Sequence, residues 1–144
     1  MRHFGKRVLS GILTILMISS ILCTSALARS SAYLNSYSAS TVPISGGRLA
    51  VTVNVIGVGP MTKIGASTIY IYESTDGKYF SQVGRYFSDD HPIMMGSGAY
   101  YYEDAIIYQG VVGRYYYASV YVYAANESGS DEKNYTTAVV KATA

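Results

Sequence analysis

The chain has 144 residues, 14% of them charged, and its formal net charge is +2 at pH 7. This length fits a single domain that is large enough to bury its own core. One cysteine excludes an internal disulfide framework, and the near balance of charge excludes a strongly basic nucleic-acid-binding protein.

The first 28 residues have the three parts of a secretory signal peptide. Met1–Arg7 is basic, Val8–Leu22 is uncharged and mostly apolar, and Ala26–Ala28 has alanine at both ends. We expect this segment to form a signal-peptide helix, to direct export and to be cleaved after Ala28. Residues 29–144 would then be a secreted single domain.

Two other interpretations of this segment compete with cleavage. The apolar run could be a membrane anchor, although its length of about 15 residues is short of the ~20 that span a bilayer. Cys23 could carry a lipid, although Leu22 precedes it where the bacterial lipobox has a small residue. Cleavage after Ala28 would leave no stable membrane anchor and no cysteine, so the core alone would have to stabilise the domain.

Cleavage also changes the charge of the chain. Eight Lys and Arg residues would remain against nine Asp and Glu residues, which gives a net charge of about −1. The exported chain would therefore have no basic excess for binding nucleic acid.

Period-two patterns predict about seven short strands after the signal peptide. They cover an irregular first strand at 29–40, followed by 48–56, 67–74, 78–87, 100–109, 115–126 and 135–143. No helical period interrupts this series. The pattern therefore predicts an all-β fold, a single antiparallel β-sandwich.

Turn residues mark the expected breaks between these strands. Val42-Pro43 fits an edge strand or a turn, and 57–60 is expected to end the second strand. Residues 89–98 and 126–131 are expected to form loops. The strand at 100–109 is expected to be interrupted near Glu103 and Asp104.

The clearest alternation lies at 115–126. One face carries Tyr116, Ala118, Val120, Val122 and Ala124, and the other carries Tyr115, Tyr117, Ser119, Tyr121 and Tyr123. Because successive side chains of a strand point to opposite sides of the sheet, we expect an aliphatic core face and a tyrosine outer face.

Gly113-x-x-Tyr116 followed by Val120-x-Val122-x-Ala124-x-Asn126 resembles the sixth strand of fibronectin type III and immunoglobulin-like sandwiches. The resemblance implies a tyrosine corner, in which the Tyr116 hydroxyl bonds back to the preceding turn. The chain departs from the antibody pattern because it has no tryptophan and no cysteine pair, and this run is two residues longer than usual. The whole chain also resembles small secreted proteins of Gram-positive gut bacteria, which implies export but no particular activity.

All 16 tyrosines lie after the predicted cleavage site. The resemblance makes the third and sixth strands neighbours, so one outward face would hold Tyr70, Tyr72, Tyr115, Tyr117, Tyr121 and Tyr123. Tyrosine combines a rigid ring with a polar hydroxyl, which suits recognition of a protein or a glycan. Alternatively, cross-strand tyrosine pairs only stabilise an exposed sheet, by ~0.2–1 kcal/mol each.

Acidic residues give only a weak metal-site candidate. Asp89, Asp90, Glu103 and Asp104 could supply oxygen ligands for Ca²⁺, but no EF-hand or zinc-site spacing is present. A solvated acidic loop is the simpler interpretation. We expect neither a metal nor another cofactor.

Catalytic patterns are also missing from the sequence. His91 is the only histidine after the predicted cleavage site, and no Gly-x-Ser-x-Gly motif occurs. The adjacent carboxylate pairs would point to opposite faces of a strand. The sequence predicts a secreted, non-catalytic protein-interaction module, with self-association among its options. The alternative is a carbohydrate-binding module that uses the tyrosine-lined sheet face.

Overall fold

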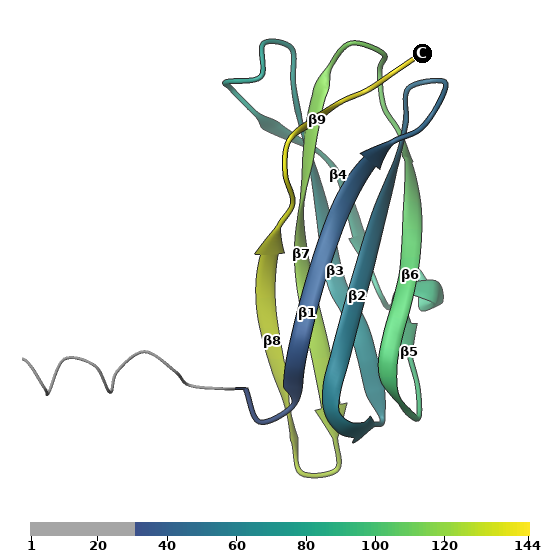
Figure 1. Ribbon diagram of the computed structural model, residues 1–144, viewed down its shortest axis with the longest axis vertical. Helices are drawn as coiled ribbons and strands as arrows, with labels where there is room; N and C mark the ends of the chain where they lie inside the picture. The colour runs from purple at the N-terminus through teal and green to yellow at the C-terminus, as the bar shows by residue number, and fades with distance from the viewer. Residues whose placement is uncertain (1–30) are drawn as a thin grey trace, which may run out of the picture. The chain divides into compact units, whose positions relative to one another are not determined.

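The computed structural model describes residues 31–144, so the predicted signal peptide and its cleavage site lie outside the described residues. This part of the chain folds into nine β-strands and one short 3₁₀ turn, η1 (Figure 1). The elements are β1 (Leu34–Pro43), β2 (Arg48–Met61), β3 (Lys63–Ser74), β4 (Ser81–Phe87), η1 (Pro92–Met94), β5 (Met95–Gly96), β6 (Ala99–Gln109), β7 (Tyr115–Asn126), β8 (Gly129–Thr136) and β9 (Val140–Lys141).

The strands form two antiparallel sheets (Figure 1). One sheet has the order β1–β2–β6. The other has the order β4–β3–β7–β8, with β5 beside β3 and β9 beside β7. The inner faces of the two sheets share one hydrophobic core, so the all-β prediction is confirmed and the described residues form a sandwich-like fold.

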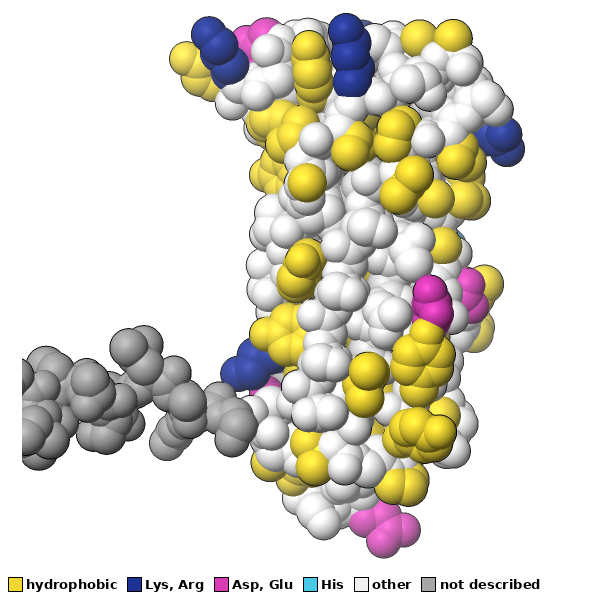
Figure 2. All heavy atoms as spheres, viewed as in Figure 1, with side chains coloured by type: hydrophobic (Ala, Val, Ile, Leu, Met, Phe, Trp, Pro, Cys, Tyr) yellow, Lys and Arg dark blue, Asp and Glu magenta, His cyan; other side chains and the backbone are white. Residues whose placement is uncertain are grey.

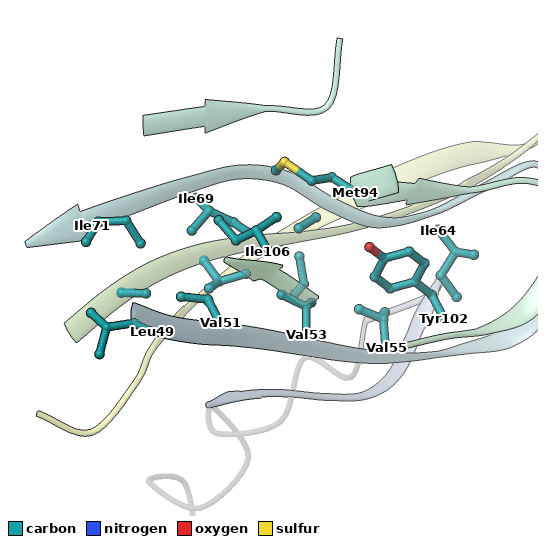
Figure 3. Close-up of a cluster of buried hydrophobic side chains, with 14 of the residues drawn as sticks. Leu49, Val51, Val53, Val55, Ile64, Ile69, Ile71, Met94, Tyr102 and Ile106 are labelled. Carbon is teal, nitrogen blue, oxygen red and sulfur yellow. The ribbon is translucent and has the colours of Figure 1, made fainter. Parts of the chain in front are cut away.

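Alternating aliphatic residues of β2 and β3 fill the space between the sheets (Figure 3). In the close-up, Leu49, Val51, Val53 and Val55 project from β2, with Ile69 and Ile71 of β3 beyond them. The predicted core face of β7 is confirmed, because Tyr116, Ala118, Val120, Val122 and Ala124 are each 0% exposed. Burial of each large side chain contributes about 1.5–3 kcal/mol relative to exposure.

Residues 126–131 do not form the expected loop. β7 and β8 form a tight hairpin in which Asn126 pairs with Gly129, and β8 runs through the charged residues Asp131, Glu132 and Lys133. β8 is an edge strand, where charged side chains are common because they discourage pairing with other chains. A pattern based on alternating buried residues did not predict β8, because this strand is polar. The predicted strand at 135–143 is replaced by the end of β8 and by β9.

The expected break at 57–60 is also wrong, because β2 continues to Met61 and β3 begins at Lys63. The pairing of β2 with β6 shifts register between Ile56 and Met61. A Cβ atom at Gly57 would lie 2.9 Å from the Met61 Cγ atom. The glycine therefore marks a close approach within an irregular strand rather than its end.

Other strand boundaries differ from the predictions for local reasons. β1 extends beyond residue 40 over Val42 and Pro43, so the edge-strand option for these two residues is confirmed. An edge strand tolerates proline because its outer backbone groups need no partner. β6 is not interrupted, since Glu103 pairs with Asn54 and Asp104 with Val53. The expected loop at 89–98 contains η1 and β5, and β4 begins only at Ser81.

A hydrogen-bonded cluster around Tyr116 joins the β6–β7 turn to the end of β3. The Tyr116 hydroxyl accepts a hydrogen bond from the Val111 backbone N–H at 2.8 Å and donates one to Glu73 Oε2 at 2.5 Å. The other carboxylate oxygen, Oε1, lies 2.6 Å from Arg114 Nη1. One buried ring thus connects a turn, a carboxylate and a guanidinium.

The cluster shifts the pKa values of Glu73 and Tyr116 in opposite directions. The hydrogen bond from Tyr116, opposed by burial and assisted by Arg114, lowers the pKa of Glu73 from its usual value of 4.5. Burial and then the Glu73 carboxylate raise the pKa of the Tyr116 hydroxyl to about 12.

We expect Tyr116→Phe to lower the free energy of unfolding by about 1–3 kcal/mol, because the variant leaves the partners of the hydroxyl unpaired. Urea unfolding at pH 7 measures the change. Tyr121→Phe is the matched control, because no hydrogen bond within residues 31–144 is lost with that hydroxyl, and it should stay within about 0.5 kcal/mol of wild type. Equal losses in the two variants would contradict the role of the cluster.

The Glu73 carboxylate should also make the free energy of unfolding depend on pH in the acid range. Because its pKa is lowered in the folded state, its contribution is present above the usual value of 4.5 and is lost as pH falls below that value. Unfolding midpoints measured from pH 7 to pH 2 should therefore fall more steeply in wild type than in Glu73→Gln. Parallel profiles would show that the carboxylate is not stabilised by folding.

Candidate functional site

The outer side of the six-stranded sheet carries the six predicted tyrosines on two adjacent strands. β3 and β7 pair directly, with Tyr72 opposite Tyr117 and Ser74 opposite Tyr115. Every second residue of β7 from Tyr116 to Ala124 is buried, so alternation directs the five residues that alternate with them, including four tyrosines of this surface, away from the core. We call the surface formed by Tyr70, Tyr72, Tyr115, Tyr117, Tyr121 and Tyr123 the tyrosine face; each of its side chains is partly buried.

One aromatic cluster lies towards the β3–β4 turn. The rings of Tyr72 and Tyr117 are stacked, with centroids 4.8 Å apart and planes inclined by only 11°. Phe80 approaches Tyr117 at a centroid distance of 4.9 Å and an angle of 63°. The stacked rings cover one face of each other, so they expose edges and hydroxyls more than ring faces.

A second cluster surrounds Tyr70. Its ring meets Tyr121 at a centroid distance of 6.0 Å and Phe87 at 6.5 Å, both at 88°. The Arg85 guanidinium lies 5.9 Å from the centroid of Phe87. Edge-to-face contacts of this kind are favourable and hold rings in defined orientations.

Tyr115 and Tyr123 lie near opposite ends of β7. The Lys141 ammonium is 5.5 Å from the centroid of the Tyr115 ring, a cation–π contact. A Cβ atom at Gly77 would be 3.5 Å from the same ring, so the β3–β4 turn packs closely against it. The structure therefore joins four of the six tyrosines into two clusters, and the other two flank them.

The sequence prediction did not include Phe80, Phe87, Arg85 or Lys141. On β4, Arg85 lies opposite Tyr70 and Phe87 opposite Thr68. The two faces of this strand have mixed character in the sequence, so its register was open. Once β4 is paired with β3, alternation places Arg85 and Phe87 on the tyrosine face.

The hydroxyls of the tyrosine face resemble most other tyrosine hydroxyls in residues 31–144, because they form no hydrogen bond with described residues. Within this range, tyrosine hydroxyls that form hydrogen bonds belong to Tyr101, Tyr102 and Tyr116. The six hydroxyls of the tyrosine face form none with other described residues. They offer donors and acceptors to solvent or to a ligand.

The outer side of the three-stranded sheet has a different character. Figure 2 shows this side, where charged side chains lie at the ends and edges and the middle is largely uncharged. Small polar residues such as Ser38 and Ser40 are exposed there. Tyr101 is 44% exposed on this side and donates a hydrogen bond to Glu103. It therefore provides a natural comparison for the tyrosine face.

The weak metal candidates are not assembled into a site. Asp89 and Asp90 follow β4, whereas Glu103 and Asp104 are adjacent residues of β6. Within residues 31–144, no group of three or more His, Cys, Asp or Glu side chains has the geometry to hold a metal ion. His91 packs its ring against Tyr86, with centroids 5.1 Å apart.

Comparison with known proteins gives no functional assignment. No family model matches the chain, and no curated protein matches it. The Northeast Structural Genomics Consortium target SoR45 aligns over 76% of this chain and 84% of its own, at 11% identity and a TM-score of 0.37. Separately, no helix within residues 31–144 is long and apolar enough to cross a membrane.

The stacked pair should contribute measurably to stability. In a double-mutant cycle of Tyr72→Ala and Tyr117→Ala, we expect a coupling free energy of about 0.5–1.5 kcal/mol, because each ring loses its partner in either single variant. Urea unfolding of the four proteins measures this coupling. Tyr72→Ala with Tyr101→Ala is the control, because those residues lie on different sheets and should give additive losses. A coupling near zero in the first cycle would contradict the packing of the pair.

Proposed function

We propose that the chain is an exported, non-catalytic protein that recognises a protein partner outside the cell through the tyrosine face. Export rests on the basic, apolar and alanine-containing segments of residues 1–28. Cleavage after Ala28 would release the chain from the membrane. The role in recognition rests on the geometry of β3 and β7.

We also propose that the fold belongs to the immunoglobulin and fibronectin type III class. The hydrogen bond from the Val111 N–H to Tyr116, at the turn that enters β7, supports this assignment. In such folds a tyrosine corner has the same arrangement, a hydroxyl bonded to backbone a few residues upstream. Two antiparallel sheets with a common core are consistent with that architecture.

The observation that carries the recognition proposal is the mutual packing of the tyrosine rings. Tyr72 with Tyr117, and Tyr70 with Tyr121, are held by ring contacts, while their hydroxyls have no partners within residues 31–144. Side chains already fixed in this way lose less conformational entropy on binding. Rigid tyrosines with free hydroxyls are typical of surfaces that bind proteins.

The same packing favours a protein over a glycan as the ligand of these clusters. A sugar ring stacks on an exposed aromatic face, but Tyr72 and Tyr117 cover each other and Phe80 packs against Tyr117. A protein can use ring edges and hydroxyls over a broad surface. No cofactor is required for such a role, and His91 packs against Tyr86 rather than pairing with a carboxylate.

Site-specific photo-crosslinking in a living culture tests the proposal. A photoreactive amino acid replaces either Tyr121 on the tyrosine face or Ser38 on the other sheet, and material outside the cell is recovered after illumination. We expect a discrete crosslinked protein only from position 121, on a chain whose first residue is Arg29. Because both sites lie in the same folded protein, Ser38 controls for random collision.

The identity of the crosslinked partner distinguishes self-association from recognition of another protein. A crosslinked band of twice the chain mass, identified as this protein, would make the partner a second copy. Equal crosslinking from both positions, or none from position 121 in correctly exported protein, would contradict recognition through the tyrosine face.

A further inference from the structure

A groove of about 540 Å³ lies at the end of the six-stranded sheet opposite the stacked Tyr72–Tyr117 pair. Tyr123 of β7 lines one part of it, and Phe87 at the end of β4 lines another. Lys63, Asp89 and Glu132 bring both signs of charge to its lining. Its volume falls within the roughly 300–1,000 Å³ that is usual for small-ligand sites.

The groove exists because β4 and β5 both pair with the same edge of β3 but leave a gap between them. β4 pairs with β3 from Thr68 onwards, whereas β5 pairs with β3 only at Ile64 and Gly65. On the other edge of β3, a register shift against β7 between Ala66 and Thr68 marks an irregularity at Ser67, which lines the groove. Between β4 and β5, no strand of residues 31–144 pairs with the edge of β3 that they share, and the gap leaves a hollow there.

The wall formed by the segment from η1 to β5 is firmly attached. Met94 is 1% exposed, and the Tyr102 hydroxyl donates a 2.7 Å hydrogen bond to the Ile93 carbonyl oxygen. Gly65 has a φ of +155°, and a Cβ atom there would clash with the Met94 carbonyl. Glycine therefore permits the close approach of β5 that forms this side of the groove.

A carboxylate is held in place on the opposite side. The Ser67 hydroxyl donates a 2.6 Å hydrogen bond to Glu132 Oε2, which connects β3 to β8 across β7. Glu132 lies opposite Tyr123 in the β7–β8 pairing, so the carboxylate and the ring are neighbours on the same side of the sheet. The Oε1 atom of Glu132 can accept a hydrogen bond from a ligand.

We propose that this groove binds a short neutral saccharide. Tyr123 supplies aromatic surface for the C–H groups of a sugar ring, and Phe87, whose ring also contacts Tyr70, adds apolar lining. The carboxylates of Asp89 and Glu132 accept hydrogen bonds from sugar hydroxyls, and the Lys63 ammonium donates one. A polyhydroxylated ring requires this combination of apolar surface, donors and acceptors.

Other small ligands fit this lining less well. Two carboxylates against one ammonium disfavour phosphate and other anions. Lys63 disfavours a cationic side chain, although the aromatic rings and the carboxylates would attract one. A purely apolar ligand would leave the charged groups without hydrogen-bond partners. The saccharide proposal goes beyond the protein-recognition proposal and does not depend on it.

Nuclear magnetic resonance titration tests the proposal. Neutral trisaccharides of glucose, mannose, galactose, xylose and N-acetylglucosamine are added separately to the purified ¹⁵N-labelled protein. We expect at least one to shift the backbone amides of Ser67, Ser88 and Tyr123 in a saturable manner. Glu132→Gln should weaken that association about tenfold, because a charged acceptor is replaced by a neutral one.

Two variants separate the groove from other surfaces. Tyr123→Ala should abolish the saturable shifts, whereas Glu103→Gln on the other sheet should leave the affinity unchanged. The amide spectrum of each variant shows directly whether it is folded. The proposal is overturned if no trisaccharide shifts these amides, or if only phosphate or a lysine-rich peptide does so. Such a result would leave the crosslinking from position 121 unaffected, so the two proposals fail separately.

Discussion

The close packing of the inner face of β7 is the constraint on which the rest of the structure depends. Ala118, Val120, Val122 and Ala124 are fully buried in the core shared by the two sheets. The only cysteine of the sequence is Cys23, so no disulfide stabilises residues 31–144. Burial of apolar surface is therefore the main force that holds the sheets together.

This constraint also determines where the tyrosines lie. Successive side chains of a strand point to opposite sides of the sheet, so when one face of β7 packs in the core, its other side chains point outward. The tyrosines of β7 then meet those of β3 because the strands pair, with Tyr72 beside Tyr117. The Glu73–Tyr116 hydrogen bond ties the same two strands together at one end. Stability and the proposed recognition surface thus share one pair of strands.

The sequence predicted those features that depend on local alternation. The two faces of β7 and the aliphatic face of β2 could be identified because a buried strand repeats its pattern over many residues. The edge strand β8 could not, because its charged residues Asp131, Glu132 and Lys133 leave no apolar alternation in the sequence. Phe87 was missed because the register of β4 is set by pairing with β3, and Phe80 was missed because it lies just before that strand. The groove depends on the gap between β4 and β5, which joins segments far apart in the sequence.

The most direct measurement compares chemical labelling of tyrosines in a living culture, the natural setting of the protein, with labelling of the purified protein. Hydroxyl-radical modification read by mass spectrometry gives a separate value for each tyrosine. Recognition through the tyrosine face predicts that Tyr70, Tyr117 and Tyr121 are labelled less in the natural setting, whereas Tyr101 on the other sheet is unchanged. Equal labelling of the tyrosine face in both settings would contradict the account, and its tyrosines would then serve only to stabilise the sheet.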